Sequence, residues 1–367
     1  MIFDHPVLMA ELHQPTPNWD AIADRFPHSQ AMKDCIQDPD WHGEGSVWKH
    51  LQMIRDYMPN RIGDSQLWTL MYHDVAKAET RQIIDGHVSH PRHSILGATY
   101  AWREMWENDI LQPTSRELVY NLILWHQRIF HIWKNPNMIR AAIHFNLNTN
   151  GRWLNLLDFA RADMLGRISK NATEGLDNLD LLVDWLKEQD IANLCVGMHD
   201  KVFYFEGENR SPYFQAQPPA GSYVIMMSGL PGSGKDTHLS RMPMRNVISL
   251  DDIRKTLKIP MGENQGTVIQ TALEQAKKYL RNKEEFVWNS TNLTRRNRDK
   301  IIKLFRDYDA FVHVNAMATP WHEILRRNKS RPLDKQVPVN VLERMLWSWE
   351  PIDHTQVHQV DWVTSPK

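Results

Sequence analysis

Apolar residues recur at helical spacing through the first half of the chain. Val47, Leu51, Ile54 and Met58 follow one another at intervals of four, three and four residues. This spacing places them on one face of a helix. A shorter pattern of the same kind occurs in residues 67–71. The first half is therefore predicted to consist of amphipathic helices packed on one another.

The second half has a different pattern, in which short apolar runs alternate with amphipathic stretches. The runs are residues 223–227, 247–250, 286–288 and 310–314, and an amphipathic helix is expected over residues 266–282. Strands that alternate with helices are typical of βαβ units. This half is therefore predicted to form a parallel sheet covered by helices.

A linker is expected between these halves, because glycine, proline and polar residues gather in residues 206–221. A chain of 367 residues is long enough for two domains. We expect an all-α domain over residues 1–210, a linker over 211–221 and an α/β domain with a parallel sheet over 222–367.

Composition is that of a soluble globular protein, with 42% hydrophobic and 24% charged residues. No apolar stretch approaches the roughly 18–20 residues of a membrane span, and the N-terminus has no signal-peptide pattern. The two cysteines, Cys35 and Cys195, exclude a disulfide framework and indicate a reducing compartment. We expect a cytoplasmic protein with no membrane partner.

Charge is distributed unevenly along the chain. Residues 235–350 hold 22 Lys and Arg against 14 Asp and Glu, whereas the remainder holds 21 against 30. A basic segment suits a polyanionic ligand such as a nucleotide or a nucleic-acid strand. A solvated basic surface is the alternative interpretation.

Residues 229–237 read Gly-Leu-Pro-Gly-Ser-Gly-Lys-Asp-Thr, directly after an apolar run. This is the pattern of a phosphate-binding loop, in which glycines let backbone N–H groups face phosphate oxygens and the lysine reaches the β- and γ-phosphates. The residues expected to bind a nucleoside triphosphate with Mg²⁺ are Gly229, Gly232, Ser233, Gly234, Lys235, Asp236 and Thr237. Asp236 stands where Ser or Thr usually holds Mg²⁺, so either Asp236 reaches the metal or Thr237 contacts phosphate.

Polar residues follow the other predicted strands at the same sheet edge. Asp251 could accept a proton from an attacking hydroxyl, and Arg254, one helical turn on, could clamp a phosphate. Alternatively Asp251 caps the next helix; Asp252 is interpreted as structural. Asn292 could hydrogen-bond a nucleic-acid end. The cations of residues 326–331 are typical of a lid over a triphosphate.

Together these motifs resemble the kinase domain of 5′-OH polynucleotide kinases. The matching stretches are Gly-Leu-Pro-Gly-Ser-Gly-Lys, Asp-Asp-x-Arg at 251–254, Thr-Asn-Leu at 291–293, Arg-Asn-Lys-Ser-Arg at 327–331 and Val-Pro-x-x-Val-Leu at 337–342. The resemblance implies that Asp251 is the general base, that Arg254 contacts a 3′-phosphate beside the acceptor hydroxyl, and that Arg331 stabilises the transferring phosphoryl. Lys235 is expected to act in catalysis and Arg327 to bind the donor, ATP or GTP.

His73-Asp74 is the second informative motif. A predicted helix carrying His50 precedes it, and Asp163 follows downstream. Imidazoles and carboxylates together form a mixed nitrogen and oxygen site for a divalent transition metal, which acidifies water for attack on phosphorus. Lys77, one turn beyond Asp74, could hold a phosphate oxygen.

These residues resemble HD-superfamily phosphohydrolases, in particular those that read His-x-Glu-Gly-x-Val-Trp-x-His, as residues 42–50 do. The resemblance implies that His50, His73, Asp74 and Asp163 bind a metal such as Mn²⁺, Ni²⁺, Co²⁺ or Zn²⁺. It implies that His93 and His126 bind a second metal or the substrate, although Gln127 stands where many members have another histidine. Arg167 is expected to contact phosphate. We expect loop or helix-surface positions for His42, His87, His90 and His131.

The order of the two domains resembles HD-Pnk, a family of bacterial enzymes that heal nucleic-acid ends. It implies phosphorylation of 5′-OH ends and removal of 2′-, 3′- or 2′,3′-cyclic terminal phosphates from RNA or DNA, as in RNA repair. Because no Lys-x-Asp-Gly motif occurs, a separate ligase is the expected partner. Two alternatives remain: an HD nucleotidase fused to a small-metabolite kinase, and a nucleotide-sensing regulator. Intact Lys235 and Asp251 speak against the regulator.

Overall fold

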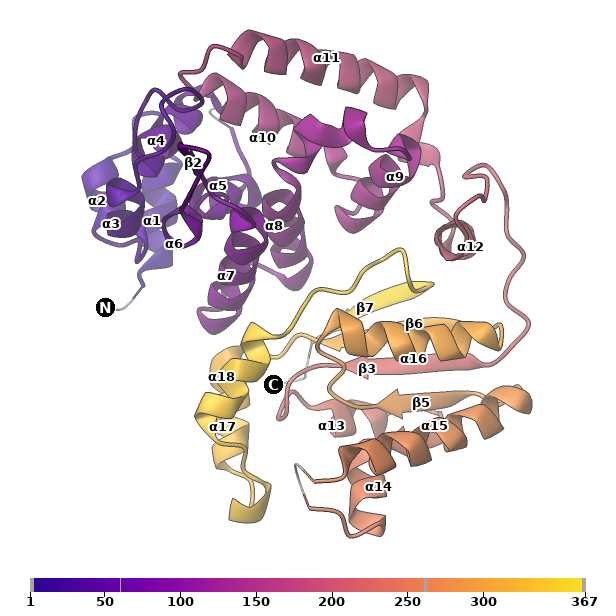
Figure 1. Ribbon diagram of the computed structural model, residues 1–367. Helices are drawn as coiled ribbons and strands as arrows, with labels where there is room; N and C mark the ends of the chain where they lie inside the picture. Colours follow the sequence, from indigo (N-terminus) through magenta and orange to yellow (C-terminus); the bar gives the residue numbers. More distant parts are fainter. Residues whose placement is uncertain (1–2, 60, 261–262, 365–367) are drawn as a thin grey trace. The chain divides into compact units, whose positions relative to one another are not determined.

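The computed structural model describes residues 3–59, 61–260 and 263–364. The chain forms two compact units, Met1–Asn193 and Leu194–Lys367. The first is helical and the second contains a parallel sheet with helices (Figure 1). The fold class expected from the sequence is therefore confirmed. Among the described residues, no helix combines the length and the apolar character that crossing a bilayer requires.

The first unit contains helices and one short hairpin. In chain order these are α1 (His5–Leu12), α2 (Trp19–Ala23), α3 (Ser29–Asp34), α4 (Val47–Tyr57), α5 (Asp64–Tyr72), α6 (Lys77–Thr80), β1 (Gln82–Ile84), β2 (His87–Ser89), α7 (His93–Glu107), α8 (Pro113–Trp125), η1 (Arg128–Lys134), α9 (Met138–Asn148), α10 (Trp153–Leu165), α11 (Ala172–Glu188) and η2 (Ile191–Asn193). Strands β1 and β2 pair in antiparallel fashion. The hairpin is an addition to the all-α fold that the apolar pattern predicted.

Helix α4 shows how the apolar pattern also places a functional side chain. Ser46 caps its N-terminus by accepting a hydrogen bond from the Lys49 N–H. The predicted apolar face is buried, with Leu51 and Ile54 fully inaccessible, and His50 lies buried beside them. The face that forms the core of this unit therefore carries a polar imidazole into its interior.

The second unit begins with a helix and continues as alternating strands and helices. These are α12 (Met198–Glu206), β3 (Tyr223–Ser228), α13 (Lys235–Leu239), β4 (Val247–Ser249), α14 (Leu250–Thr256), α15 (Gln265–Arg281), β5 (Phe286–Asn289), α16 (Arg295–Asp307), β6 (Phe311–Met317), α17 (Trp321–Lys329), η3 (Leu333–Lys335), α18 (Val339–Trp347) and β7 (Gln359–Val363). The described strands form a sheet in the order β4-β5-β3-β6-β7, and every pairing is parallel. Strand β7 was not predicted.

Strand β3 is the centre of this sheet, between β5 and β6. Its register pairs Val224 with Phe286 on one side and with Val312 on the other. All three residues are fully buried. Because the strands are parallel, the segments that follow β3, β4 and β5 emerge at one edge of the sheet. That edge carries the phosphate-binding loop.

Helix α12 belongs to the second unit and packs on the rest of it, although its residues precede the predicted linker. The His199 ring lies 5.8 Å from the Phe311 ring, and Glu206 forms an ion pair with Arg306. Residues 207–222 then contain no helix or strand. The two compact units consequently divide at Asn193, earlier than the boundary at residue 210 that proline and glycine content suggested.

Candidate functional sites

Six of the predicted metal ligands come together in the interior of the first unit. Three lie at helix ends: His73 just after α5, His93 at the start of α7 and His126 just after α8. His50 and Asp163 lie within α4 and α10, which contact each other. Asp74, the sixth, follows His73 directly. All six residues are buried, with at most 3% of their surface exposed.

Asp74 lies at the centre of this cluster. Its Oδ2 is 3.3 Å from His73 Nε2 and 4.0 Å from His50 Nε2. Its Oδ1 is 3.2 Å from His93 Nε2 and 3.7 Å from His126 Nε2. The two carboxylate oxygens thus face two different pairs of imidazoles, a geometry that suits one metal on each side of Asp74.

The hydrogen bonds behind the rings set which nitrogen is free to bind a metal. The Nδ1 atoms of His73, His93 and His126 lie 2.8, 2.7 and 2.7 Å from the carbonyl oxygens of Leu70, His90 and Ile123. The Nδ1 of His50 lies 3.0 Å from the carbonyl of Gly166. A carbonyl only accepts, so each Nδ1 carries the proton, and a neutral ring then has its lone pair on Nε2. All four Nε2 atoms face the central carboxylates.

Several buried atoms at this centre have no hydrogen-bond partner among the described residues. They include both oxygens of Asp74 and Nε2 of His73. Unpaired polar atoms are costly in a protein interior, and a metal ion would satisfy these. The donors are imidazole nitrogens and carboxylate oxygens, which suit a divalent transition metal. The residues therefore fit the metal that the HD resemblance implies.

The electrostatics of the cluster keep Asp74, Asp163 and His126 in the form that binds metals, whereas for His50 burial is outweighed by hydrogen bonds to Asp163 and Glu44, which raise its pKa. Burial would raise the pKa of Asp74, but the Lys77 ammonium, the charge of His73 and hydrogen bonds from His73 and His93 together outweigh it and hold that pKa well below its usual range. For Asp163, burial is outweighed in the same way by Arg167 together with His50 and His73. Burial lowers the pKa of His126 to about 3, so this imidazole is neutral near pH 7. The carboxylates are ionised and His126 offers a lone pair.

Two cations lie beside the cluster. Lys77 Nζ forms an ion pair with Asp74 Oδ2 at 2.7 Å and donates a hydrogen bond to Gln37 Oε1 at 2.6 Å. Arg167 forms a two-pronged ion pair with Asp163. Gln37 is itself buried and its amide nitrogen has no partner among the described residues. The structure thus brings Lys77 and Arg167 to the cluster, and adds Gln37, which no sequence motif marked.

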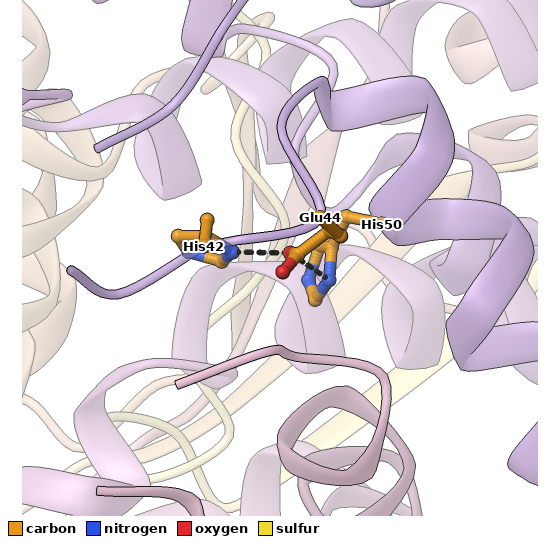
Figure 2. A group of neighbouring side chains, drawn as sticks. All are labelled: His42, Glu44 and His50. Carbon is orange, nitrogen blue, oxygen red and sulfur yellow. Dashed lines mark hydrogen bonds and ion pairs between the residues drawn. The ribbon is translucent and has the colours of Figure 1, made fainter. Parts of the chain in front are cut away.

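His42 lies in the loop before α4, one of the positions expected for it, but it is buried and donates from Nδ1 to Glu44 Oε1 at 2.7 Å (Figure 2). Its ring lies 4.8 Å from the ring of His50. His90 likewise points inward, because its Nδ1 lies 2.8 Å from the Lys77 carbonyl. The His-x-Glu spacing within residues 42–50 was the available signal for His42.

In the second unit the phosphate-binding loop connects β3 to α13. Gly232 and Gly234 have φ of 85° and 90°, a conformation that a side chain would strain. The loop is braced from below: the Gly229 N–H donates to the Thr291 carbonyl at 2.9 Å, and the Thr319 hydroxyl donates to the Ser233 carbonyl at 2.7 Å. These hydrogen bonds to neighbouring segments at the sheet edge therefore fix the backbone conformation of the phosphate-binding loop.

Lys235 and Asp236 follow the loop at the start of α13. The Lys235 ammonium donates to the carbonyls of Gly229 and Leu230, at 2.9 Å each. Burial lowers the pKa of Lys235 to about 8 against the opposing charges of Asp236 and Asp251. Asp236 accepts a hydrogen bond from the Asn289 amide at 2.9 Å. This bond fixes the carboxylate that replaces the usual Ser or Thr, and Thr237 is exposed.

The predicted base and the cations lie around the same loop. Asp251 is in the first turn of α14, its side chain is 80% exposed, and it pairs with Arg254. Arg254 also donates to Gln265 at 2.9 Å. Arg331 is close enough for its charge to lower the pKa of Lys235. Arg327 forms an ion pair within α17 instead, at 2.5 Å from Glu323.

Asn292 has a different position from the one expected of a substrate contact. It is buried, and its amide donates to the Met227 carbonyl at 2.6 Å. Its own carbonyl accepts from the Ser228 hydroxyl and from Arg298. These bonds tie the segment after β5 to the end of β3, so Asn292 supports the phosphate-binding loop from behind.

Comparison with known proteins agrees with this part of the chain. A family model described as an AAA domain (AAA_33) matches residues 224–352, which include the loop, Asp251 and the cationic helix α17. No curated protein matches the chain. The second unit is therefore a P-loop domain for which a nucleotide-kinase type of activity is supported, and the helical first unit is consistent with an HD domain.

Proposed function

We propose that the protein is a bifunctional enzyme that heals broken nucleic-acid ends. The second unit phosphorylates a 5′-OH end with a nucleoside triphosphate and Mg²⁺. The first unit hydrolyses a 2′-, 3′- or 2′,3′-cyclic terminal phosphate with a divalent transition metal. The observation that carries the proposal is the set of four imidazoles that face Asp74 through Nε2, in a chain that also contains a P-loop unit.

In the first unit the metal would acidify a water molecule for attack on phosphorus. It would be held by His50, His73, Asp74 and Asp163, with His93 and His126 available for a second ion or for the substrate. Lys77 and Arg167 place positive charge beside the cluster, where phosphate oxygens would be neutralised.

In the second unit the exposed Asp251 carboxylate, which is paired with Arg254, would accept the proton of an incoming hydroxyl. Arg254, beside Asp251, would form hydrogen bonds to a phosphate of the nucleic-acid strand that carries this hydroxyl. Lys235 and Arg331 would bind the transferred phosphoryl group, and Asp236, oriented by Asn289, would contact Mg²⁺.

The proposed substrate class is a polynucleotide end. The excess of Lys and Arg in residues 235–350 suits a chain of phosphates more than a small metabolite. A separate ligase would then seal the healed ends of RNA or DNA, because the chain has no Lys-x-Asp-Gly motif.

The test uses the full-length protein and an oligonucleotide with a 5′-OH and a 3′-phosphate. We expect Asp251→Asn to reduce 5′ phosphorylation by about 10²-fold or more, a typical contribution of a general base. The neighbouring Asp252→Asn is the matched control, because Asp252 pairs with Lys255 rather than with Arg254. Equal losses in both variants would contradict the assignment of Asp251.

Phosphate release is tested in the same way with His73→Ala, which should abolish hydrolysis and leave phosphorylation intact. His13→Ala is its control, since His13 pairs with Asp64 at the surface. If the protein acts on mononucleosides but not on oligonucleotides, a nucleotidase fused to a metabolite kinase replaces the proposal.

A further inference from the structure

Glu44 is a buried carboxylate at the edge of the metal cluster. It lies in the loop before α4, between His42 and His50 (Figure 2), and its side chain is fully inaccessible. Its Oε1 is 2.7 Å from His42 Nδ1 and 3.0 Å from His50 Nδ1. Its Oε2 accepts from the Ile168 N–H at 2.9 Å. Three donors therefore converge on one carboxylate.

His50 differs from the other imidazoles in needing such a partner. His73, His93 and His126 each turn Nδ1 toward the carbonyl three residues earlier. For His73 and His126 that carbonyl is in the last turn of a helix, has no N–H partner within the helix and can accept from the side chain, and for His93 it is in the loop before α7. His50 lies inside α4, where the carbonyls of the preceding turn accept helix N–H groups, as the Ser46 carbonyl does from the His50 N–H. Its Nδ1 must find acceptors elsewhere in the chain.

Those acceptors are Glu44 and the Gly166 carbonyl, both 3.0 Å from Nδ1. Together they hold the proton on Nδ1 and direct Nε2 toward Asp163, at 2.9 Å. A carboxylate behind a ligating imidazole also makes the ring a stronger electron donor. We propose that Glu44 is the positioning residue of this metal site, holding His50 in its metal-binding orientation.

Glu44 also ties His50 to the segment that carries Asp163. The bond from Ile168 to Glu44 is matched by a bond of 2.8 Å from the Gly43 N–H to the Ile168 carbonyl. These two bonds join the loop before α4 to the residues that follow α10. Removing the carboxylate would loosen two ligands that are 113 residues apart in sequence.

The chemistry of the three donors requires a carboxylate. All are N–H groups, so both oxygens must accept. Hydrogen bonds from His42, His50 and Ile168 outweigh burial and hold the pKa of Glu44 well below its usual range. A glutamine of the same shape has one oxygen and one NH₂ group, so at least one N–H would face another donor.

The experiment measures metal affinity rather than turnover alone. Full-length protein freed of metal is titrated with Co²⁺, whose visible absorbance reports both binding and ligand geometry. We expect Glu44→Gln to bind Co²⁺ about 10–100-fold more weakly, as is typical when a partner behind a ligand is lost. Hydrolysis by this variant should recover at high Co²⁺, and 5′ phosphorylation should be unchanged.

The matched control is Glu104→Gln. Glu104 accepts from His28 at 2.7 Å and from the Tyr72 hydroxyl at 2.6 Å in the same unit, and neither partner is in the metal cluster. It should leave Co²⁺ affinity unchanged. If Glu44→Gln does not fold, Glu44→Asp, which keeps the charge but is one methylene shorter, should weaken binding in the same direction.

The outcomes separate this inference from the proposed hydrolase on which it rests. Wild-type affinity in the Glu44 variants, or equal weakening by Glu104→Gln, would overturn the positioning role alone. A wild-type protein that binds no Co²⁺ and hydrolyses no phosphoester would overturn the metal site and this inference together.

Discussion

Gly166 offers a test of the metal site that changes none of its ligands. This glycine caps the end of α10, three residues after Asp163, and its carbonyl accepts from His50. A Cβ added here would lie 2.8 Å from the backbone nitrogen of Ile54 and 2.9 Å from its Cα. Both atoms belong to the α4 backbone, which cannot rotate away as a side chain would.

The size of the effect follows from those distances. Ordinary carbon contacts begin near 3.5 Å, so Gly166→Ala must separate the two helices by roughly 0.5 Å or more. Overpacking of this kind costs about 1–3 kcal/mol, and a catalytic group displaced by about 1 Å can lose about 10²-fold in rate. We expect the melting temperature to fall by about 2–4 °C for each kcal/mol lost.

The assay compares Gly166→Ala with Gly175→Ala in the full-length protein. At position 175 the added Cβ would meet only the flexible end of the Met164 side chain, and alanine favours the helix. Gly166→Ala should lower Co²⁺ affinity and hydrolysis by at least about tenfold, while Gly175→Ala should not. Indistinguishable variants would refute the view that α4 and α10 set the ligand geometry.

Three further outcomes are expected. Burial lowers the pKa of Lys235 to about 8, and only the ammonium form binds phosphate, so affinity for the triphosphate should fall roughly tenfold from pH 7 to pH 9. Calorimetric titration should show this decrease in the wild type and not in Lys235→Arg, whose guanidinium stays charged. His126→Ala should reduce bound metal by one ion per chain on elemental analysis; unchanged stoichiometry with slower hydrolysis would assign His126 to the substrate. Asn292→Ala should destabilise the second unit by about 1–3 kcal/mol in denaturant titration through the unpaired Met227 carbonyl, and an unchanged midpoint would contradict its bracing role.

Much of the fold was readable because its signals are local. The apolar runs at 223–227 and 286–288 became the central strands β3 and β5, and the expected helix over 266–282 is α15. Strand β7 lacked such a signal: Gln359–Val363 contains Gln and Asp and is only partly buried, at the edge of the sheet. The compact units divide at Asn193 rather than near residue 210, because α12 is held by contacts with residues about 100 positions away in sequence.

In the candidate sites too, contiguous motifs were predictable from the sequence, whereas roles that depend on distant contacts were not. The phosphate-binding loop and the His73-Asp74 pair are contiguous motifs, and their chemistry follows from residue type and spacing. Asn292 was assigned to substrate because its polarity was visible, whereas its burial under the loop depends on the pairing of β3 with β5. Arg327, predicted as a lid cation, forms an ion pair with Glu323, one turn earlier in α17, which no sequence motif marked.

The histidines show how far a local rule extends. A histidine at a helix end turns its Nδ1 to the carbonyl three residues back, as His73 and His126 do, so its free nitrogen follows from its place in the helix. His50 lies inside a helix, where the carbonyl three residues back takes part in the hydrogen bonds of the helix itself, and its orientation depends on Glu44 and Gly166. A metal-binding histidine in mid-helix therefore implies an acceptor for its Nδ1 outside that helix, and a buried carboxylate near it in sequence is the first candidate.

The Glu44 variants and Gly166→Ala probe the two acceptors of His50 separately. If both weaken metal binding while substitution of Glu104 does not, the orientation of His50 is set by contacts outside its own helix.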